Sequence, residues 1–160
     1  MSLFMVPAYW AAQLLGGFVG SLIARASLQK EEFAQIGAGA TLLSPGELWH
    51  QGLIVETMLT LILTQTVLNA AVDTSDNMLA PLAIGLTVAL DIFSAGSISG
   101  ASMNPARSLG PSIAGSIFVE GNGSVFWTYH YIYWAGPLLG ATISAGVYRL
   151  LFSRGSRLIS

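Results

Sequence analysis

Four long apolar stretches constrain this chain more than any other feature of its sequence. They cover residues 6–24, 53–72, 78–93 and 127–151, and across the chain 53% of residues are hydrophobic while only 9% are charged. Soluble domains carry about a quarter charged residues, whereas roughly 20 apolar residues span the hydrocarbon core of a bilayer. The sequence therefore predicts an all-α membrane protein with four transmembrane helices.

Residues flanking these stretches follow the pattern expected at a membrane surface. Tyr9 and Trp49 lie near the starts of the first two stretches, where interfacial aromatic residues are common. Arg149, Arg154 and Arg157 follow the last stretch, and positive residues favour the cytoplasmic side. We therefore expect a multi-pass integral membrane protein with both ends of its four-span bundle in the cytoplasm, and we expect the plasma membrane as its location.

The composition argues against several other classes of function. The chain has no cysteine, and His50 and His130 are too few and too far apart to suggest a metal cluster. A net charge of -2 without a basic run argues against nucleic-acid binding. Gly-x-Ser-x-Gly, HExxH and paired catalytic aspartates do not occur, so we predict no enzyme activity, no metal and no cofactor.

Residues 94–118, SAGSISGASMNPARSLGPSIAGSIF, are too polar for an ordinary span and too apolar for a surface loop. Irregular backbone at membrane depth is tolerated only where it is buried or lines a watery cavity. Asn104 can cap the free N–H groups of a helix, and Pro105 suits a first helical turn. The segment therefore predicts a re-entrant loop that dips into the membrane and returns as a short half-helix.

Two kinds of residue inside the apolar segments bear on packing and function. Glu56, Asp91 and Arg107 are ionisable, and such groups at membrane depth usually face a protein interior or a water path. Asp91 could accept hydrogen bonds within the neighbouring loop, but the sequence suggests no firm role for it. The pairs Gly16–Gly20 and Gly136–Gly140 have the GxxxG spacing that allows close helix contact.

The sequence GLTVALDIFSAGSISGASMNPARSLG, residues 85–110, resembles the fifth span, re-entrant loop and second NPA motif of the aquaporin family. The resemblance continues through HYIYWAGPLLGA (sixth span) and extends back through VETMLTLILTQ (fourth span) and AYWAAQLLGG (third span). It implies an aquaporin-like right-handed helical bundle around a single-file pore, assembled as a homotetramer. An arginine and half-helix dipoles that exclude protons and cations are a known device of aquaporin pores.

The resemblance covers essentially all of residues 1–160 but only part of the family pattern. A complete aquaporin has two inverted repeats, each with three spans and one NPA half-helix, whereas we find four spans and one NPA. We therefore expect a partial aquaporin domain without the first two spans and the first NPA half-helix. It would be either a fragment or a truncated product.

The resemblance also implies roles for particular residues. Asn104, Pro105 and Ala106 match the NPA motif, in which the asparagine donates hydrogen bonds to passing water. The alternative is that Asn104 only caps the half-helix, and the two roles are compatible. Glu56 matches a buried glutamate that holds the re-entrant loop through backbone N–H groups, although it could instead extend to the membrane interface. Asn122 begins a glycosylation sequon on the predicted outer side.

Three of the four selectivity-filter positions of the family map onto Ile92, Ala101 and Arg107. Strict water channels have histidine at the position of Ile92, and the combination here resembles the aquaporin-8 type. A wider, less polar filter of this kind implies passage of ammonia and hydrogen peroxide beside water. Glycerol-conducting relatives have aspartate at the position of Ser108, so glycerol is disfavoured.

We thus expect a channel that passively conducts water and small neutral solutes across the lipid bilayer. The main alternative is a truncated, non-conducting subunit that associates with full-length channels. A secondary transporter could also contain broken helices, but the sequence offers no buried carboxylate pair for ion coupling.

Overall fold

The computed structural model describes residues 3–72, 77–121 and 123–152, and every regular element in these ranges is helical. The main helices are α1 (Val6–Ser27), α2 (Lys30–Gln35), α3 (Trp49–Val67), α4 (Ala80–Ser99), α5 (Pro105–Phe118) and α6 (Ile132–Val147). Five short helical turns accompany them: η1 (Leu3–Met5), η2 (Gly37–Gly39), η3 (Leu68–Val72), η4 (Gly123–Phe126) and η5 (Tyr148–Phe152).

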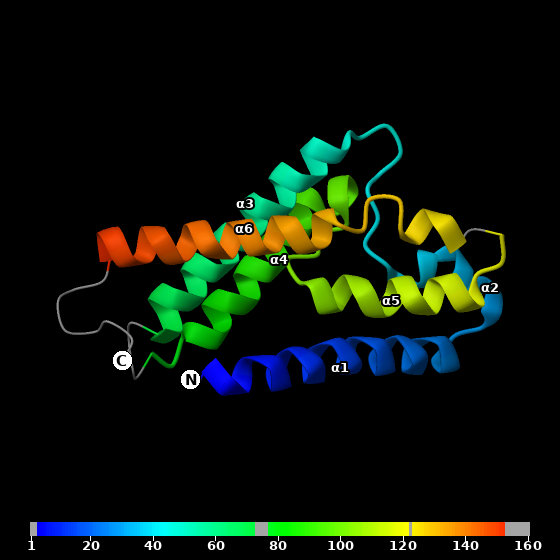
Figure 1. The fold of residues 1–160 in the computed structure, drawn as a ribbon, viewed down its shortest axis with the longest axis horizontal. Coiled ribbons are helices and arrows are strands. Elements are labelled where there is room, and N and C mark those ends of the chain that lie inside the picture. Colours follow the sequence, from blue (N-terminus) through cyan, green and yellow to red (C-terminus); the bar gives the residue numbers. More distant parts are fainter. Residues whose placement is uncertain (1–2, 73–76, 122, 153–160) are drawn as a thin grey trace.

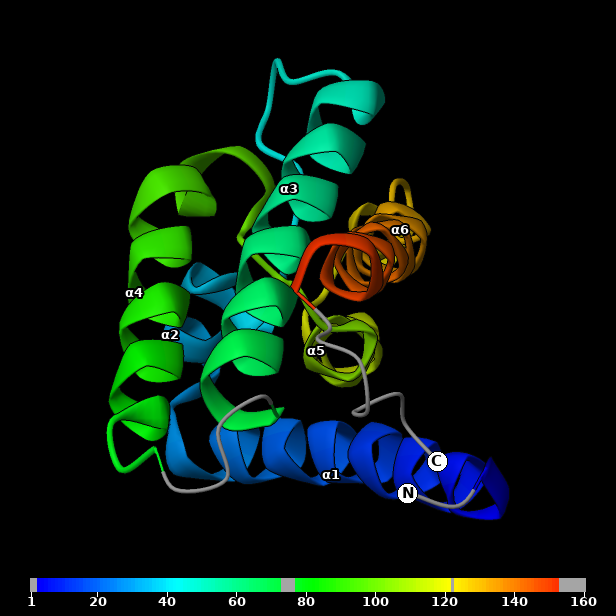
Figure 2. The ribbon, with the colours of Figure 1, turned by 90° about the vertical axis from the view of Figure 1, so that its left-hand side faces the viewer.

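Within the described residues, four continuous helical stretches are long and apolar enough to cross a membrane. They are Leu3–Ser27, Trp49–Val72, Ala80–Ser99 and Ile132–Phe152, with lengths of 25, 24, 20 and 21 residues. At about 1.5 Å per residue, each reaches the roughly 30 Å thickness of a hydrocarbon core. Figures 1 and 2 show that α3 and α4 run side by side, with α6 against α3 and α1 alongside α5.

The third predicted span, 78–93, is too short, because α4 continues to Ser99. Residues 94–99 look like loop in the sequence, yet the hydroxyl groups of Ser94 and Ser99 have acceptors within the helix or on a neighbour. Ser94 Oγ donates to the Asp91 carbonyl (3.0 Å), and Ser99 Oγ donates to Glu56 (2.6 Å). The predicted re-entrant segment 94–118 therefore consists of the end of α4, a non-helical turn at 100–104, and α5.

The last predicted span, 127–151, begins too early. Residues 127–131 form turns, and α6 starts at Ile132. The Trp127 indole Nε1 donates to Ser116 Oγ of α5 (2.7 Å), which holds this aromatic segment against the half-helix. Asn122, Arg154 and Arg157, on which the glycosylation and part of the orientation predictions rest, lie outside the described residues.

Glycines allow α6 to pack closely on α3, as the GxxxG spacing predicts. A Cβ atom on Gly136 would lie 2.6 Å from Glu56 Cβ, and one on Gly140 would overlap the Thr57 carbonyl oxygen. The close approach brings the backbone of α6 next to Glu56, in the middle of the bundle.

The contact between α1 and α5 uses a different glycine from the predicted pair. The Gly16–Gly20 spacing would allow close helix contact, but a Cβ atom on either glycine would meet nothing within 4 Å, so this pair makes no close contact in the described structure. Gly17 makes the contact instead: a Cβ there would overlap the Ala106 carbonyl, and one on Gly110 would overlap the Gly17 backbone. Helix α1 therefore contacts α5 through Gly17, the residue directly after the first glycine of the Gly16–Gly20 pair.

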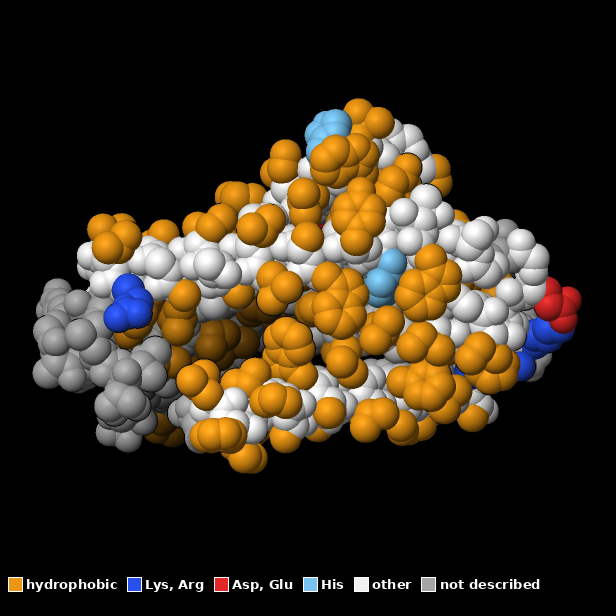
Figure 3. Space-filling view, viewed as in Figure 1, with side chains coloured by type: hydrophobic (Ala, Val, Ile, Leu, Met, Phe, Trp, Pro, Cys, Tyr) orange, Lys and Arg blue, Asp and Glu red, His pale blue; other side chains and the backbone are white. Residues whose placement is uncertain are grey.

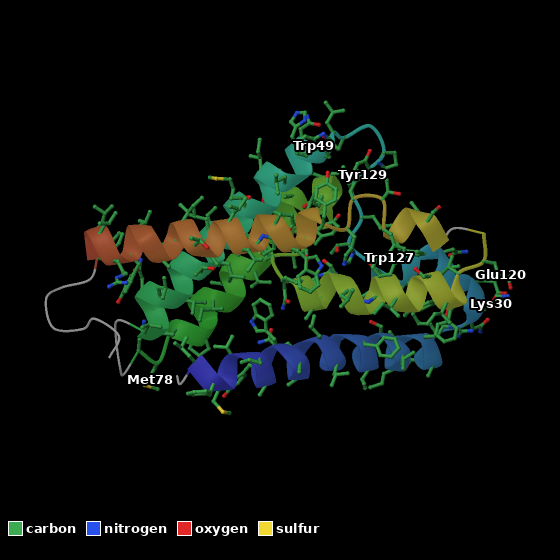
Figure 4. The ribbon with its side chains drawn as sticks, viewed as in Figure 1. Lys30, Trp49, Met78, Glu120, Trp127 and Tyr129 are labelled. Carbon is green, nitrogen blue, oxygen red and sulfur yellow. The ribbon has the colours of Figure 1, made fainter. Side chains whose placement is uncertain are left out.

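Residues from α1, α2 and the end of α5 form a cap at one end of the molecule. The Arg25 guanidinium lies 5.7 Å from the ring centre of Phe33 and 5.6 Å from that of Phe118. Beside it, Lys30 Nζ and Glu120 Oε1 form an ion pair of 2.7 Å (Figure 4). Hydrogen bonding and charge from Lys30 lower the pKa of Glu120. The pair is exposed, so aromatic packing contributes more to this cap than the ion pair.

Candidate pore site

The N-terminus of α5 is built by its own sequence. Asn104 has an extended backbone (φ -154°, ψ 116°), and its Oδ1 accepts a hydrogen bond of 2.9 Å from the Ala106 N–H. Pro105 follows as the first helical residue, where a missing N–H costs nothing. Asn104 is exposed, whereas Ala106 is buried against the Gly17 region of α1.

The turn before Asn104 has an unfavourable backbone conformation. Gly100, Ala101 and Met103 all have positive φ, of 82°, 45° and 55°. For residues other than glycine the left-handed region costs roughly 1–2 kcal/mol each. Such a turn persists only where the surrounding structure compensates for that cost.

Glu56 on α3 supplies the compensating contacts. Its side chain is fully buried, and Oε1 accepts hydrogen bonds from Ser102 N–H (2.8 Å) and Ser99 Oγ (2.6 Å). Its Oε2 accepts a bond of 2.8 Å from Met103 N–H. Both carboxylate oxygens are therefore directed at the turn, and α3 fixes the position at which α5 begins.

A second set of buried polar residues surrounds this carboxylate. Tyr133 Oη donates to the Ser99 carbonyl (2.8 Å). Thr41 Oγ1 lies 2.6 Å from Ser108 Oγ, and Ser108 Oγ is also hydrogen-bonded to Ser102 Oγ. Sequence reasoning missed Thr41, Ser99, Ser102 and Tyr133, because hydroxyl groups have no periodic signal and most of their partners are distant in sequence.

The opposite side of the motif is open. A groove of about 320 Å³ lies between α1 and the α3–α6 pair, and Figure 3 shows a hollow between these two parts of the molecule. Its lining includes Asn104, Pro105 and Ala106 of the motif, together with Trp10 and Gln13 of α1 and Trp134 of α6.

The three candidate filter residues lie on three successive segments. Arg107 is exposed on the first turn of α5, and its Nη1 donates a long hydrogen bond of 3.4 Å to the Gly39 carbonyl. Ile92 on α4 has 46% of its side chain exposed. The Ala101 methyl group is fully buried and packs with Leu59 and other apolar residues.

The remaining ionisable candidates lie away from the open groove. Asp91 lies on α4; it is buried, and its Oδ2 has no hydrogen-bond partner among the described residues. His130 is buried with Nδ1 3.3 Å from Ser112 Oγ, and burial lowers its pKa. His50 is exposed and contacts the Trp49 ring edge-on.

The sequence is similar to proteins of one known family. Residues 1–148 match the model of the family described as major intrinsic protein. Aquaporin-8 of Mus musculus is 36% identical over 152 residues, which are 94% of this chain and 54% of the mouse protein. Aquaporin TIP1-2 of Zea mays is 37% identical over 155 residues, 95% of this chain and 56% of the maize protein.

A solved structure shows the same fold. The X-ray structure of the aquaglyceroporin from Plasmodium falciparum matches with a TM-score of 0.78 and 22% sequence identity, covering 94% of this chain and 66% of that one. Bilayer-length helices and an asparagine-capped half-helix define an all-helical integral membrane protein. The chain belongs to the major intrinsic protein family, the aquaporins. It spans about half the length of the curated relatives that it matches.

Proposed function

We propose that this chain forms part of a transmembrane channel that passively conducts water and small neutral solutes, ammonia and hydrogen peroxide among them. The observation that carries the proposal is the exposed N-terminus of α5, where Asn104 lines an open groove and Arg107 follows one turn of helix later. A buried carboxylate, Glu56, would hold this end of the helix in place.

The hydrogen bonds of Asn104 suit it for contact with water. Its Oδ1 accepts a hydrogen bond from the Ala106 N–H, which fixes the side chain, and the side-chain amide NH₂ is a donor that can bind a ligand. That NH₂ can donate to the oxygen of a water molecule. The half-helix adds partial positive charge at its N-terminus, which raises the energy of a cation or hydronium ion nearby.

Ile92, Ala101 and Arg107 are proposed as this chain's part of a selectivity filter. Arg107 would supply charge and hydrogen-bond donors, while the exposed Ile92 side chain would supply an apolar wall. An apolar wall makes the passage of ammonia less unfavourable than a second polar one would. Homotetrameric assembly and residence in the plasma membrane belong to the same proposal.

The second candidate function is that of a truncated, non-conducting subunit that associates with full-length channels. The favouring observation is that α1 leaves a broad apolar flank uncovered, with Leu15, Val19 and Ile23 exposed by 64%, 50% and 61%.

The deciding experiment is osmotic shrinkage of proteoliposomes that contain this chain alone, followed by light scattering beside empty liposomes. The channel proposal predicts shrinkage clearly faster than in empty liposomes, with low activation energy. Arg107→Ala should admit more protons and cations, while Lys30→Ala, an exposed cation at the far cap, should behave as wild type.

Shrinkage no faster than in empty liposomes would reject conduction by the chain alone. Co-reconstitution with a full-length aquaporin then tests the second function, which predicts complex formation and a reduced water flux. Ammonia uptake, measured with a pH-sensitive dye trapped in the same vesicles, tests the solute range.

A further inference from the structure

Three hydroxyl groups form a buried chain between the α1–α3 connection and the NPA turn. Thr41, Ser102 and Ser108 are exposed by only 1%, 3% and 0%. Thr41 Oγ1 lies 2.6 Å from Ser108 Oγ, Ser108 Oγ is hydrogen-bonded to Ser102 Oγ, and Ser102 Oγ donates to the Asn104 carbonyl at 2.9 Å. The chain of bonds therefore runs from residue 41 to the backbone of the pore asparagine.

Each hydroxyl group has one hydrogen to donate, and this limits which residue is the donor in each bond. A carbonyl oxygen can only accept, so the one hydroxyl hydrogen of Ser102 goes to Asn104. When Ser102 donates there, its oxygen accepts from Ser108 and from the Asn104 N–H (3.3 Å), and Ser108 accepts from Thr41. Thr41 is thus the first donor of the chain, and it comes from an element other than the re-entrant segment.

The segment that contains Thr41 also contacts the same turn and the end of α4 just before it. A Cβ atom on Gly100 would lie 3.0 Å from Thr41 Cα, which shows how closely the two backbones approach. Ser44 N–H donates to the Ile98 carbonyl at 2.9 Å. Two residues before Thr41, the Gly39 carbonyl accepts the hydrogen bond from Arg107. One short segment therefore contacts both the turn and the exposed arginine.

We propose that Thr41 is a positioning residue for the pore motif. Through its hydroxyl it fixes residues 37–47 against the start of α5. It thereby sets where Asn104 and Arg107 lie relative to each other. The predicted effect on conduction rests on the proposed channel function, but the geometric effect does not.

Thr41 could instead stabilise this region only by filling space, and two substitutions separate the cases. Thr41→Val keeps the shape of the side chain but removes the donor, whereas Thr41→Ser keeps the donor and removes a methyl group. A positioning hydroxyl predicts that serine preserves the wild-type behaviour and valine does not. Simple space filling predicts the reverse order.

The test is amide hydrogen exchange on the whole chain in lipid nanodiscs. Loss of one buried hydrogen bond should speed exchange about five- to tenfold in residues 38–42 and 101–106 of Thr41→Val. Exchange in α3 should not change, and Thr41→Ser should stay within about twofold of wild type everywhere. Wild-type exchange in Thr41→Val, or equal acceleration in both variants or throughout α3, would overturn the proposal.

A flux measurement on the same variants keeps this inference separate from the channel proposal. In conducting vesicles Thr41→Val should raise the ratio of urea to water permeability, while water permeability itself changes little. If the wild type does not conduct, the exchange experiment still decides on Thr41. If the wild type conducts and the exchange is unaltered, the positioning role fails and the channel proposal stands.

Discussion

The residues around the NPA motif have two faces that differ sharply in how their polar groups are satisfied. On the inner face, Glu56 binds two backbone N–H groups and a hydroxyl, and Ser108 is fully buried between two other hydroxyl groups. On the outer face Asn104 is exposed, and Arg107 makes one long hydrogen bond to Gly39.

The difference shows that one set of polar groups holds the turn in place, while another set is exposed and free to act on water or solutes. In the turn, the two non-glycine residues with positive φ are Ala101 and Met103, and Glu56 accepts hydrogen bonds from this turn on the inner face. On the outer face, the exposed side chains of Asn104 and Arg107 therefore keep N–H donors that can bind water or solute. Substitutions on the inner face should therefore lower stability most, whereas those on the outer face should lower it less and change what passes or binds.

The largest effect is expected from Glu56→Ala. It leaves the N–H groups of Ser102 and Met103 and the hydroxyl of Ser99 without their acceptor. Since each buried unsatisfied donor costs about 1–3 kcal/mol, we expect a loss of roughly 3–5 kcal/mol in the free energy of unfolding. Detergent-induced unfolding followed by tryptophan fluorescence measures it, with the exposed Glu31→Ala as the control. Equal unfolding midpoints for the two variants would contradict the account.

A smaller loss is expected from Gly17→Val, which forces a side chain into the backbone contact between α1 and α5. Overpacking of this kind costs about 1–3 kcal/mol. The neighbouring Gly16→Val places the same side chain where nothing lies within 4 Å, so its unfolding midpoint should match that of wild type or exceed it slightly. The same unfolding assay measures both variants, and an equal loss in both would disprove the helix register described here.

Asn104→Ala should cost about 1 kcal/mol, because the Ala106 N–H loses its cap. Asn104→Asp keeps an acceptor for that N–H and should restore the unfolding midpoint, while it adds negative charge to the open groove. Measured in vesicles, the aspartate variant should admit cations more readily than the wild type. If alanine and aspartate lowered the midpoint equally, the capping role would be excluded.

The smallest effect on stability is expected from Arg107→Ala, below about 0.5 kcal/mol, because the side chain is exposed and its hydrogen bond to the Gly39 carbonyl is long. Its effect should appear instead in the proton and cation permeability of vesicles. A loss of stability comparable to that of the glutamate variant would show that the outer face supports the fold as strongly as the inner face.

Sequence reasoning predicted the class of fold well, because apolar length and low charge are properties of single segments. It misplaced the end of α4, since Ser94 and Ser99 look like loop residues until their acceptors are known. It also selected Gly16 and Gly20, although Gly17 makes the helix contact. A spacing rule identifies a pair of small residues but not the face on which the partner helix packs.

Only some residues of the candidate site could be predicted from the sequence. The NPAR motif and Glu56 were found through resemblance, and the structure shows the Glu56 hydrogen bonds explicitly. Thr41 and Tyr133 were not found, because their partners lie 67 and 34 residues away along the chain. Ala101 was assigned to the filter, yet its side chain is fully buried, a position that depends on the positive φ of this turn.

The most direct test of the two-faced motif uses the absence of native cysteine. The rate of reaction with a water-soluble thiol reagent would be measured for Arg107→Cys and Ser108→Cys, two neighbouring positions on the first turn of α5. The account predicts rapid labelling of the variant at the exposed position 107 and labelling at least about tenfold slower at the buried position 108. Similar rates at the two positions would contradict it, because the inner face would then be as open to water as the outer one.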